Sequence, residues 1–198
     1  MSVRVYVEGG GDNKDTLKRC KEGFARYCQK VVPPSHSPRI VACGGRQQAF
    51  DRFLTAIGES LPDETCALLV DSEGAVRTGS EVQHLQDRDG WNFPDLYHHR
   101  VFLMVQAMEA WFLADHSVLT SFYNGGFQGN SLPRNPNIES IAKDRLEPAL
   151  KHATRQTRTK GEYHKTKHGF ALLELVDPEA VGNASLHAKR FNDFLKSL

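Results

Sequence analysis

The stretch VRVYVEGGGD at residues 3–12 ends a strand-like run on a carboxylate, Glu8, and follows it with three glycines. The alternating valines before Glu8 are typical of a β-strand. Glycines let a backbone or a ligand approach closely, because they carry no side chain. A carboxylate in this setting can bind a divalent metal, and the space beside it can take a phosphate-bearing substrate.

Two further acids follow a second apolar run. Asp71 and Glu73 come directly after CALLV at residues 66–70. If the backbone stays extended, these two side chains point the same way, with Cα atoms about 6 to 7 Å apart. Acids that share a small volume raise one another's pKa unless a cation neutralises them. Because Mg²⁺ prefers carboxylate oxygens, the sequence predicts a Mg²⁺ (or Mn²⁺) site built from Glu8, Asp71 and Glu73.

A second glycine cluster follows the strand-like run RIVAC at residues 39–43. In an open parallel α/β sheet, ligands bind beyond the carboxyl ends of the strands. We therefore expect both glycine clusters and the arginine after the second one to lie beside the acids and to contact substrate phosphate. The predicted phosphate-binding residues are Gly9, Gly10, Gly44, Gly45 and Arg46.

Each of these patterns also has an ordinary structural interpretation. A single acid after a strand is most often a helix N-cap or a solvated loop residue, and Asp12 is a candidate N-cap for the helix that follows. The basic run RQTRTKGEYHKTKHG at residues 155–169 can grip phosphates, but it can equally be a solvated loop. The sequence has no GxxxxGK[ST] motif, so residues 8–14 are not a P-loop.

The elements that position these residues alternate between strand and helix. We expect strands at 3–8, 39–43, 66–70 and 101–105, and helices at 13–31, 46–60, 107–114, 138–153, 168–175 and 184–197. Residues 72–98 are expected to be mostly loop with a short helix at 82–85, and residues 123–137 to be a long connection. This order predicts an α/β, Rossmann-like, mainly parallel sheet flanked by helices. We expect one domain over 1–198, with an α/β core at 1–115 and a mostly helical part at 116–198.

Composition limits the class of protein. The 198 residues are 39% hydrophobic and 25% charged with a net charge of +1, which is typical of a globular protein and gives no global basic field. A local basic patch can still bind nucleic acid. The sequence has no apolar run long enough for a membrane span, no leader pattern and no CxxC pair. We expect a cytoplasmic protein with reduced cysteines and no membrane contact.

VEGGGD and LLVDSEG together resemble the Toprim fold of topoisomerases, bacterial primases and the overcoming-lysogenization-defect nucleases. The resemblance implies that Glu8 is the strand-end glutamate, which binds Mg²⁺ and serves as general acid or base in phosphoryl transfer. It implies that Asp71 is the first acid of the DxD pair. Glu73 falls where the second aspartate belongs, and its extra methylene changes the expected metal geometry.

The whole chain is similar to domain-of-unknown-function family 4276. The matching pieces are VEGGGD, RIVACGGR, LLVDSE, DGW, LMVQAMEAWFLAD and KTKHGFALLELVDP. Because they lie in these motifs, four more residues are implied to belong to the site. Glu109 is expected to complete the metal shell, Lys165 and His168 to act on the phosphate or the leaving oxygen, and Gln106 to bind substrate.

The resemblance predicts a Mg²⁺-dependent nuclease or phosphoryl-transfer enzyme of Toprim type. DNA or RNA is the expected substrate. Toprim-type nucleases commonly act beside an ATPase, so the resemblance also implies an ATPase partner and a role in phage defence. A homo-oligomer is compatible with the sequence. Two other interpretations remain open: a non-catalytic partner or sensor subunit of an ATPase, and an enzyme that acts on a small phosphorylated molecule.

Overall fold

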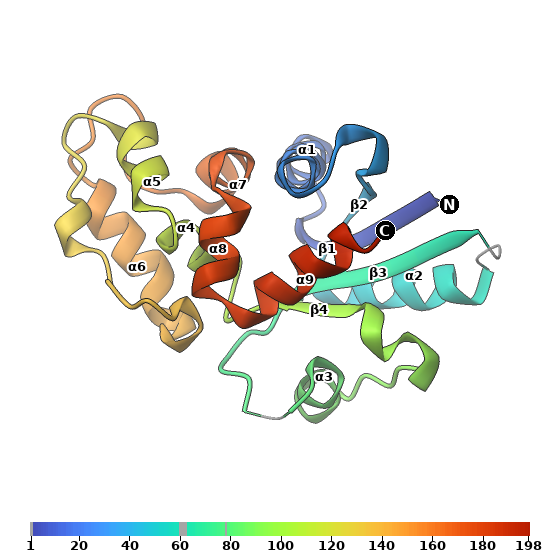
Figure 1. The fold of residues 1–198 in the computed structure, drawn as a ribbon. Helices are drawn as coiled ribbons and strands as arrows, with labels where there is room; N and C mark the ends of the chain where they lie inside the picture. The colour runs from blue at the N-terminus through green and yellow to red at the C-terminus, as the bar shows by residue number, and fades with distance from the viewer. Residues whose placement is uncertain (1, 60–62, 78) are drawn as a thin grey trace.

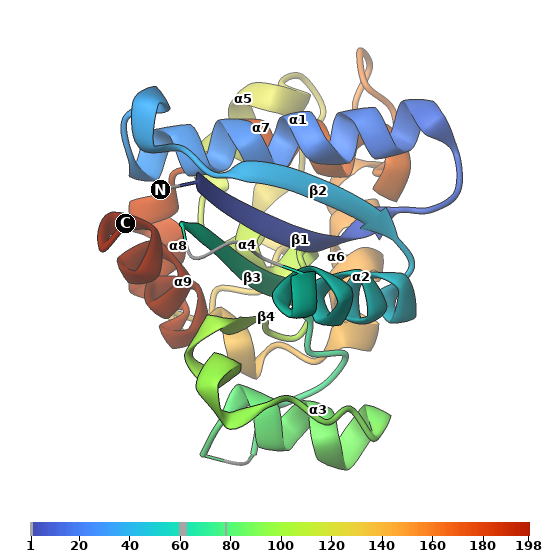
Figure 2. The same ribbon diagram turned by 90° about the vertical axis from the view of Figure 1, so that its right-hand side faces the viewer.

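A four-stranded parallel sheet forms the centre of the computed structural model, which describes residues 2–59, 63–77 and 79–198. The strands lie in the order β2-β1-β3-β4, as Figure 2 shows. Their bounds are β1 Ser2–Gly10, β2 Arg39–Gly44, β3 Glu64–Asp71 and β4 Val101–Met104. Because all four run in the same direction, their carboxyl ends meet at one edge of the sheet.

Helices cover both faces of the sheet, and the alternation along β1 shows why. Val5 and Val7 are buried on the face covered by α1 (Lys14–Val31) and α9 (Leu186–Lys196). Tyr6, between them, is buried on the opposite face with α2 (Arg46–Glu59) and α3 (Glu81–Asp89). The predicted Rossmann-like sheet flanked by helices, with helices in the C-terminal part, is confirmed.

The C-terminal part of the chain is helical. Its helices are α4 Glu109–Leu113, α5 His116–Tyr123, α6 Lys143–Thr154, α7 Phe170–Leu175 and α8 Pro178–Ala184, followed by α9. Figure 1 shows α4, α5 and α6 grouped at the end of the sheet away from the two chain termini. The helix α7 packs against α1, and α9 packs against β4. The described part of the chain contains no helix that is both long and apolar enough to cross a membrane.

The structure corrects the expected elements in the first half of the chain. The N-cap of α1 is Asn13, whose side chain accepts hydrogen bonds from two amides of the first turn, and not Asp12. Residues 72–98 contain more helix than expected, because Ser80 caps the start of α3 and Gly90 ends it in a left-handed conformation. A 3₁₀ segment at Asp95–Arg100 follows. Residue 60, at the end of the predicted 46–60 helix, and residue 78 lie outside the described residues.

The second half of the chain differs from the prediction at element boundaries. The expected helix at 138–153 is a 3₁₀ turn, Ile138–Ser140, followed by α6, because the backbone at Ile141 is extended. The helix at 168–175 begins as a π-helical turn, Lys165–Gly169, that runs into α7. The helices α5 and α8 are not predicted at all.

Candidate functional site

Glu8, Asp71 and Glu73 lie together at the carboxyl edge of the sheet. Glu8 is near the end of β1, Asp71 ends the adjacent parallel strand β3, and one ligand oxygen from each of the three lies within 4.8 Å of the others. The spacing predicted for Asp71 and Glu73 requires the backbone to stay extended after Asp71. The backbone turns instead, since Glu73 has a φ of 65°. The left-handed turn at Glu73 nevertheless leaves its carboxylate beside the other two.

Asp71 is the most buried of the three acids, at 6% exposure. Its Oδ1 accepts a hydrogen bond of 2.8 Å from the Met108 amide, and its own amide donates one of 3.2 Å to Glu8 Oε2. Burial, with Glu8 as the next cause, raises the pKa of Asp71 to about 8. Burial also raises the pKa of Glu8, although Arg46 opposes the shift. A bound cation would relieve both effects, because it favours the ionised carboxylates.

Arg46 is held by the protein's own acids. Its Nη1 lies 3.2 Å from Glu8 Oε2 and also donates to the backbone oxygen of Asp71. Its Nη2 lies 2.6 Å from Asp89 Oδ2, and the guanidinium sits 4.8 Å above the Trp91 ring. Arg46, at the start of α2, therefore lies beside the acids as predicted. Its contacts with Asp89 and Trp91, which hold it there, were not predicted from the sequence.

Glu73 is paired with two cations that the sequence analysis missed. Lys143, the first residue of α6, forms an ion pair with Glu73, and Arg88 Nη2 lies 3.6 Å from Glu73 Oε2. Gln106 forms hydrogen bonds with both members of the Glu73–Lys143 ion pair. Its backbone oxygen accepts from the Glu73 amide at 2.9 Å, and its Oε1 accepts from the Lys143 amide at 2.9 Å. The Gln106 side chain also donates to the backbone oxygen of Glu139 at 3.1 Å. Its contacts in the structure thus support the segment around Glu73.

Glu109 is buried and paired with Lys165. Lys165 Nζ lies 3.1 Å from Glu109 Oε1, and the Tyr163 hydroxyl donates to the same oxygen at 3.3 Å. Burial lowers the pKa of Lys165, but Glu109 and then Asp71 outweigh it, so the net shift is upward and the side chain stays charged. Glu109 is not part of the three-acid group of ligand atoms found among the described residues. Tyr163 was not predicted as a site residue, although it stands two residues before Lys165.

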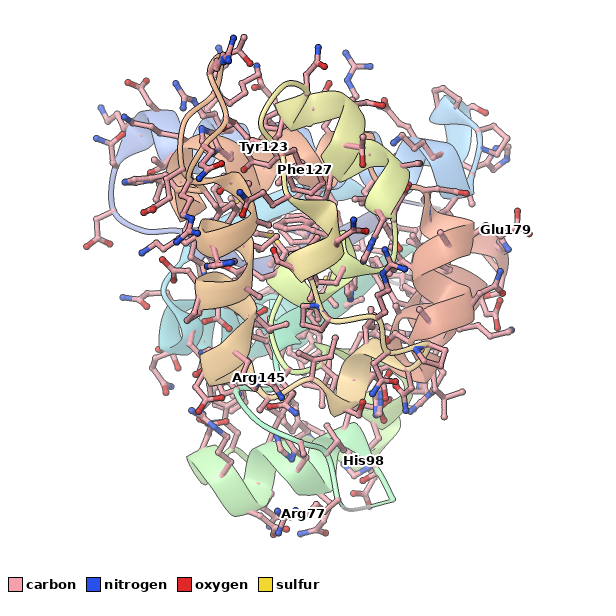
Figure 3. The ribbon with its side chains drawn as sticks, turned by 90° about the vertical axis from the view of Figure 1, so that its left-hand side faces the viewer. Arg77, His98, Tyr123, Phe127, Arg145 and Glu179 are labelled. Carbon is pink, nitrogen blue, oxygen red and sulfur yellow. The ribbon has the colours of Figure 1, made fainter. Side chains whose placement is uncertain are left out.

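His168 lies among aromatic side chains. It is 8% exposed, and its Nδ1 lies 3.0 Å from the hydroxyl of Tyr123. The Tyr123 ring stacks on Phe127 with centroids 5.8 Å apart, and Figure 3 shows these two residues close together at the end of α5. Burial, and then His164, lower the pKa of His168, so its neutral form is favoured. The structure joins His168 to this aromatic group and not to the side chains that line the cavity beside the acids.

A cavity of about 370 Å³ opens beside the acids. Gly9, Gly10 and Gly11 all have positive φ, and a Cβ on Gly10 would lie only 2.9 Å from the Leu17 backbone. Gly44 lines the same cavity, whereas Gly45 does not. The lining residues are Glu8, Gly9, Gly10, Gly11, Asp12, Asn13, Thr16, Gly44, Asp71, Met104, Met108, Lys165, Thr166 and Phe170.

The donor set suits a hard divalent cation. Three carboxylates supply only oxygen ligands, which Mg²⁺ and Mn²⁺ prefer. Burial, with a neighbouring acid as a smaller cause, raises the pKa values of Glu8 and Asp71, and a cation bound between the carboxylates would favour their ionised forms. The three carboxylates therefore fit such an ion. To bind it, the Glu73 carboxylate would turn one oxygen from its ion pairs with Lys143 and Arg88 toward the metal.

The family model described as a domain of unknown function (DUF4276) matches residues 7–197. The chain belongs to the DUF4276 family. This match covers every residue of the candidate site, from Glu8 on β1 to His168 in the π-helical turn. Searches of curated proteins and of solved structures gave no match to the chain.

Proposed function

We propose that this DUF4276 protein is a Mg²⁺-dependent nuclease or related phosphoryl-transfer enzyme of Toprim type. The observation that carries the proposal is the convergence of Glu8, Asp71 and Glu73, with ligand oxygens within 4.8 Å, beside a glycine-lined cavity that also receives Lys165. A divalent ion bound there supplies Lewis-acid stabilisation of the negative charge that develops on a phosphoryl oxygen.

The protein's own residues supply orientation, proton transfer and charge. Glycines 9–11 leave room for a phosphate to approach the acids. Lys165, held by Glu109, provides a fixed positive charge for a non-bridging phosphate oxygen at the cavity wall. Glu8 lines the cavity, where it can take a proton from water or return one to the leaving oxygen.

A non-catalytic role is supported by one specific observation. Arg46 already pairs with Glu8, and Arg88 and Lys143 already pair with Glu73, so two of the three acids have cation partners within the chain. In a partner or sensor subunit these pairs would stay closed. An ATPase partner, a role in phage defence, assembly as a homo-oligomer and a cytoplasmic location stay predictions from the sequence and its resemblance.

The direct test is nicking of supercoiled plasmid by the purified protein with Mg²⁺, Mn²⁺ or EDTA. The variants are Glu8→Gln and Asp71→Asn, and Asp51→Asn on the exposed surface of α2 is the charge-matched control. We expect metal-dependent nicking that both site variants lose and the control keeps, with all four proteins folded. No nicking with either metal, or nicking by the site variants at the wild-type rate, would contradict the proposal.

A further inference from the structure

A second hollow adjoins the cavity beside the acids. It has a volume of about 230 Å³ and is lined by α1, the π-helical turn and α7. Phe170 lines both spaces, so it forms the wall between them. On one side of Phe170 lie Thr16 and Lys165, and on the other lie Arg19 and Lys167. Both spaces are therefore lined by α1 and by the π-helical turn with α7, and the first space is the one that contains the acids.

The acids that line the second hollow form ion pairs, whereas its two cations form none with the described residues. Glu22 pairs with Lys18 at 3.9 Å, and Glu174 pairs with Arg26 at 3.7 Å. Across residues 2–59, 63–77 and 79–198, no carboxylate lies within 4.0 Å of a side-chain nitrogen of Arg19 or Lys167. Both of these cations are exposed. The hollow thus presents two cations that have no ion-pair partner among the described residues, beside two acids that pair with other cations.

The charged residues that precede Lys167 in the sequence are also mostly basic. The segment that leads into the π-helical turn, residues 155–167, contains five lysines and arginines and a single acid, Glu162. The cations are Arg155, Arg158, Lys160, Lys165 and Lys167. The first cavity has the opposite character, since it receives Glu8 and Asp71. In the metal-free protein an anion is therefore held more readily beyond Phe170 than at the acids themselves.

The geometry points to a second phosphate-binding position, formed by Arg19 and Lys167, for a nucleic-acid strand that crosses Phe170. This inference rests on the proposed function, because the reacting phosphate would lie in the first cavity beside Lys165. With the metal bound, a molecule with one phosphate would occupy the first cavity and leave Arg19 and Lys167 without a partner. A strand with successive phosphates fills both positions, and sequence-independent phosphate contacts of this kind supply most of the affinity of non-specific binding.

The test measures binding without catalysis. Fluorescence anisotropy of a labelled single-stranded DNA 12-mer is recorded in EDTA over a range of salt concentrations, with the full-length protein. The double variant Arg19→Gln/Lys167→Gln is compared with Arg39→Gln/Lys196→Gln, which removes two exposed cations at the opposite edge of the sheet. Unlabelled trinucleotide and mononucleotide serve as competitors, and hydrolysis of bis(4-nitrophenyl) phosphate with Mn²⁺ is measured in parallel.

We expect the Arg19/Lys167 variant to bind the 12-mer at least about fivefold more weakly, with a salt slope smaller by about 1.4, since each single-strand phosphate contact contributes about 0.7. The control should bind as wild type does, and trinucleotide should compete better than mononucleotide. Equal binding by wild type and the Arg19/Lys167 variant, no binding by wild type, or equal competition by mononucleotide would overturn the inference. Hydrolysis of the small diester tests the proposed reaction separately, because it does not require the second position.

Discussion

Lys165 Nζ lies 3.1 Å from Glu109 Oε1, and this contact joins the π-helical turn to the first residue of α4. The carboxylate is buried, while the lysine side chain is 48% exposed and lines the cavity. The pair therefore fixes the direction of a charged side chain that would otherwise be mobile. In this arrangement Glu109 positions Lys165, which differs from the metal-ligand role predicted from sequence.

Replacing Glu109 separates these two roles. We expect Glu109→Gln to lower kcat for plasmid nicking by about 10- to 100-fold, because a misplaced cation stabilises the transition state less well. Mn²⁺ affinity should stay within a factor of two of wild type. The control is Asp193→Asn, which breaks an exposed pair with Lys189 on α9. A large loss of Mn²⁺ affinity in Glu109→Gln would instead make Glu109 a metal ligand.

Stability of the metal-free protein should fall as pH rises. Burial and the neighbouring Glu8 raise the pKa of Asp71 to about 8 from an ordinary value of 3.8. Between these values the folded carboxyl holds a proton that the unfolded chain has released. The free energy of unfolding therefore decreases by up to about 1.4 kcal/mol for each pH unit.

Urea unfolding in EDTA at pH 5.5, 6.5 and 7.5 measures this dependence, and Asp71→Asn removes it. Burial of Glu8 acts in the same direction. The lowered pKa of His168 acts in the opposite direction below pH 6.5, where the unfolded imidazole takes up a proton. The contribution of His168 is shared by wild type and Asp71→Asn, whereas Glu8 interacts directly with Asp71, so the difference between the two proteins reports the Asp71–Glu8 pair. Parallel pH profiles would show that Asp71 has an ordinary pKa.

The glycine loop makes a prediction about backbone geometry. Gly10 has a φ of 90°, and a Cβ there would lie 2.9 Å from the Leu17 backbone. We expect Gly10→Ala to lower the free energy of unfolding by about 2 kcal/mol or more, because strain and a clash add together.

Gly58 in α2 is the matched control, since a Cβ there meets nothing within 4 Å. Gly58→Ala should raise the free energy of unfolding by roughly 0.5 to 1 kcal/mol, because alanine favours a helix over glycine. Chemical unfolding of both variants measures the two effects. A Gly10→Ala variant as stable as wild type would mean that the loop moves away from α1 without cost.

The strands and the grouping of the three acids could be predicted because their signals are local. Alternating or continuous apolar residues identify β1 and β3, and parallel strands place their carboxyl ends at one edge, so Glu8 and Asp71 converge. The turn at Glu73 carries no such signal, because its left-handed φ falls on a residue other than glycine.

The partners of these acids could not be predicted, since they come from elements far away in the sequence. Lys143 reaches Glu73 from the start of α6, and Tyr163 reaches Glu109 from the loop before the π-helical turn. No spacing rule relates residues that are 54 or more positions apart. The basic segment at 155–169 was ambiguous for a similar reason, because only packing shows that Lys165 faces the cavity while His168 is buried.

The central claim is that Glu8, Asp71 and Glu73 bind a divalent cation. It is tested most directly by titrating the metal-free protein with Mn²⁺ and measuring free Mn²⁺ by electron paramagnetic resonance, with Glu8→Gln, Asp71→Asn and the Asp51→Asn control in parallel. We predict about one bound ion for wild type and the control, and at least about tenfold weaker binding for each site variant. Absence of a bound ion in wild type, or equal affinity in Glu8→Gln and Asp71→Asn, would contradict the account.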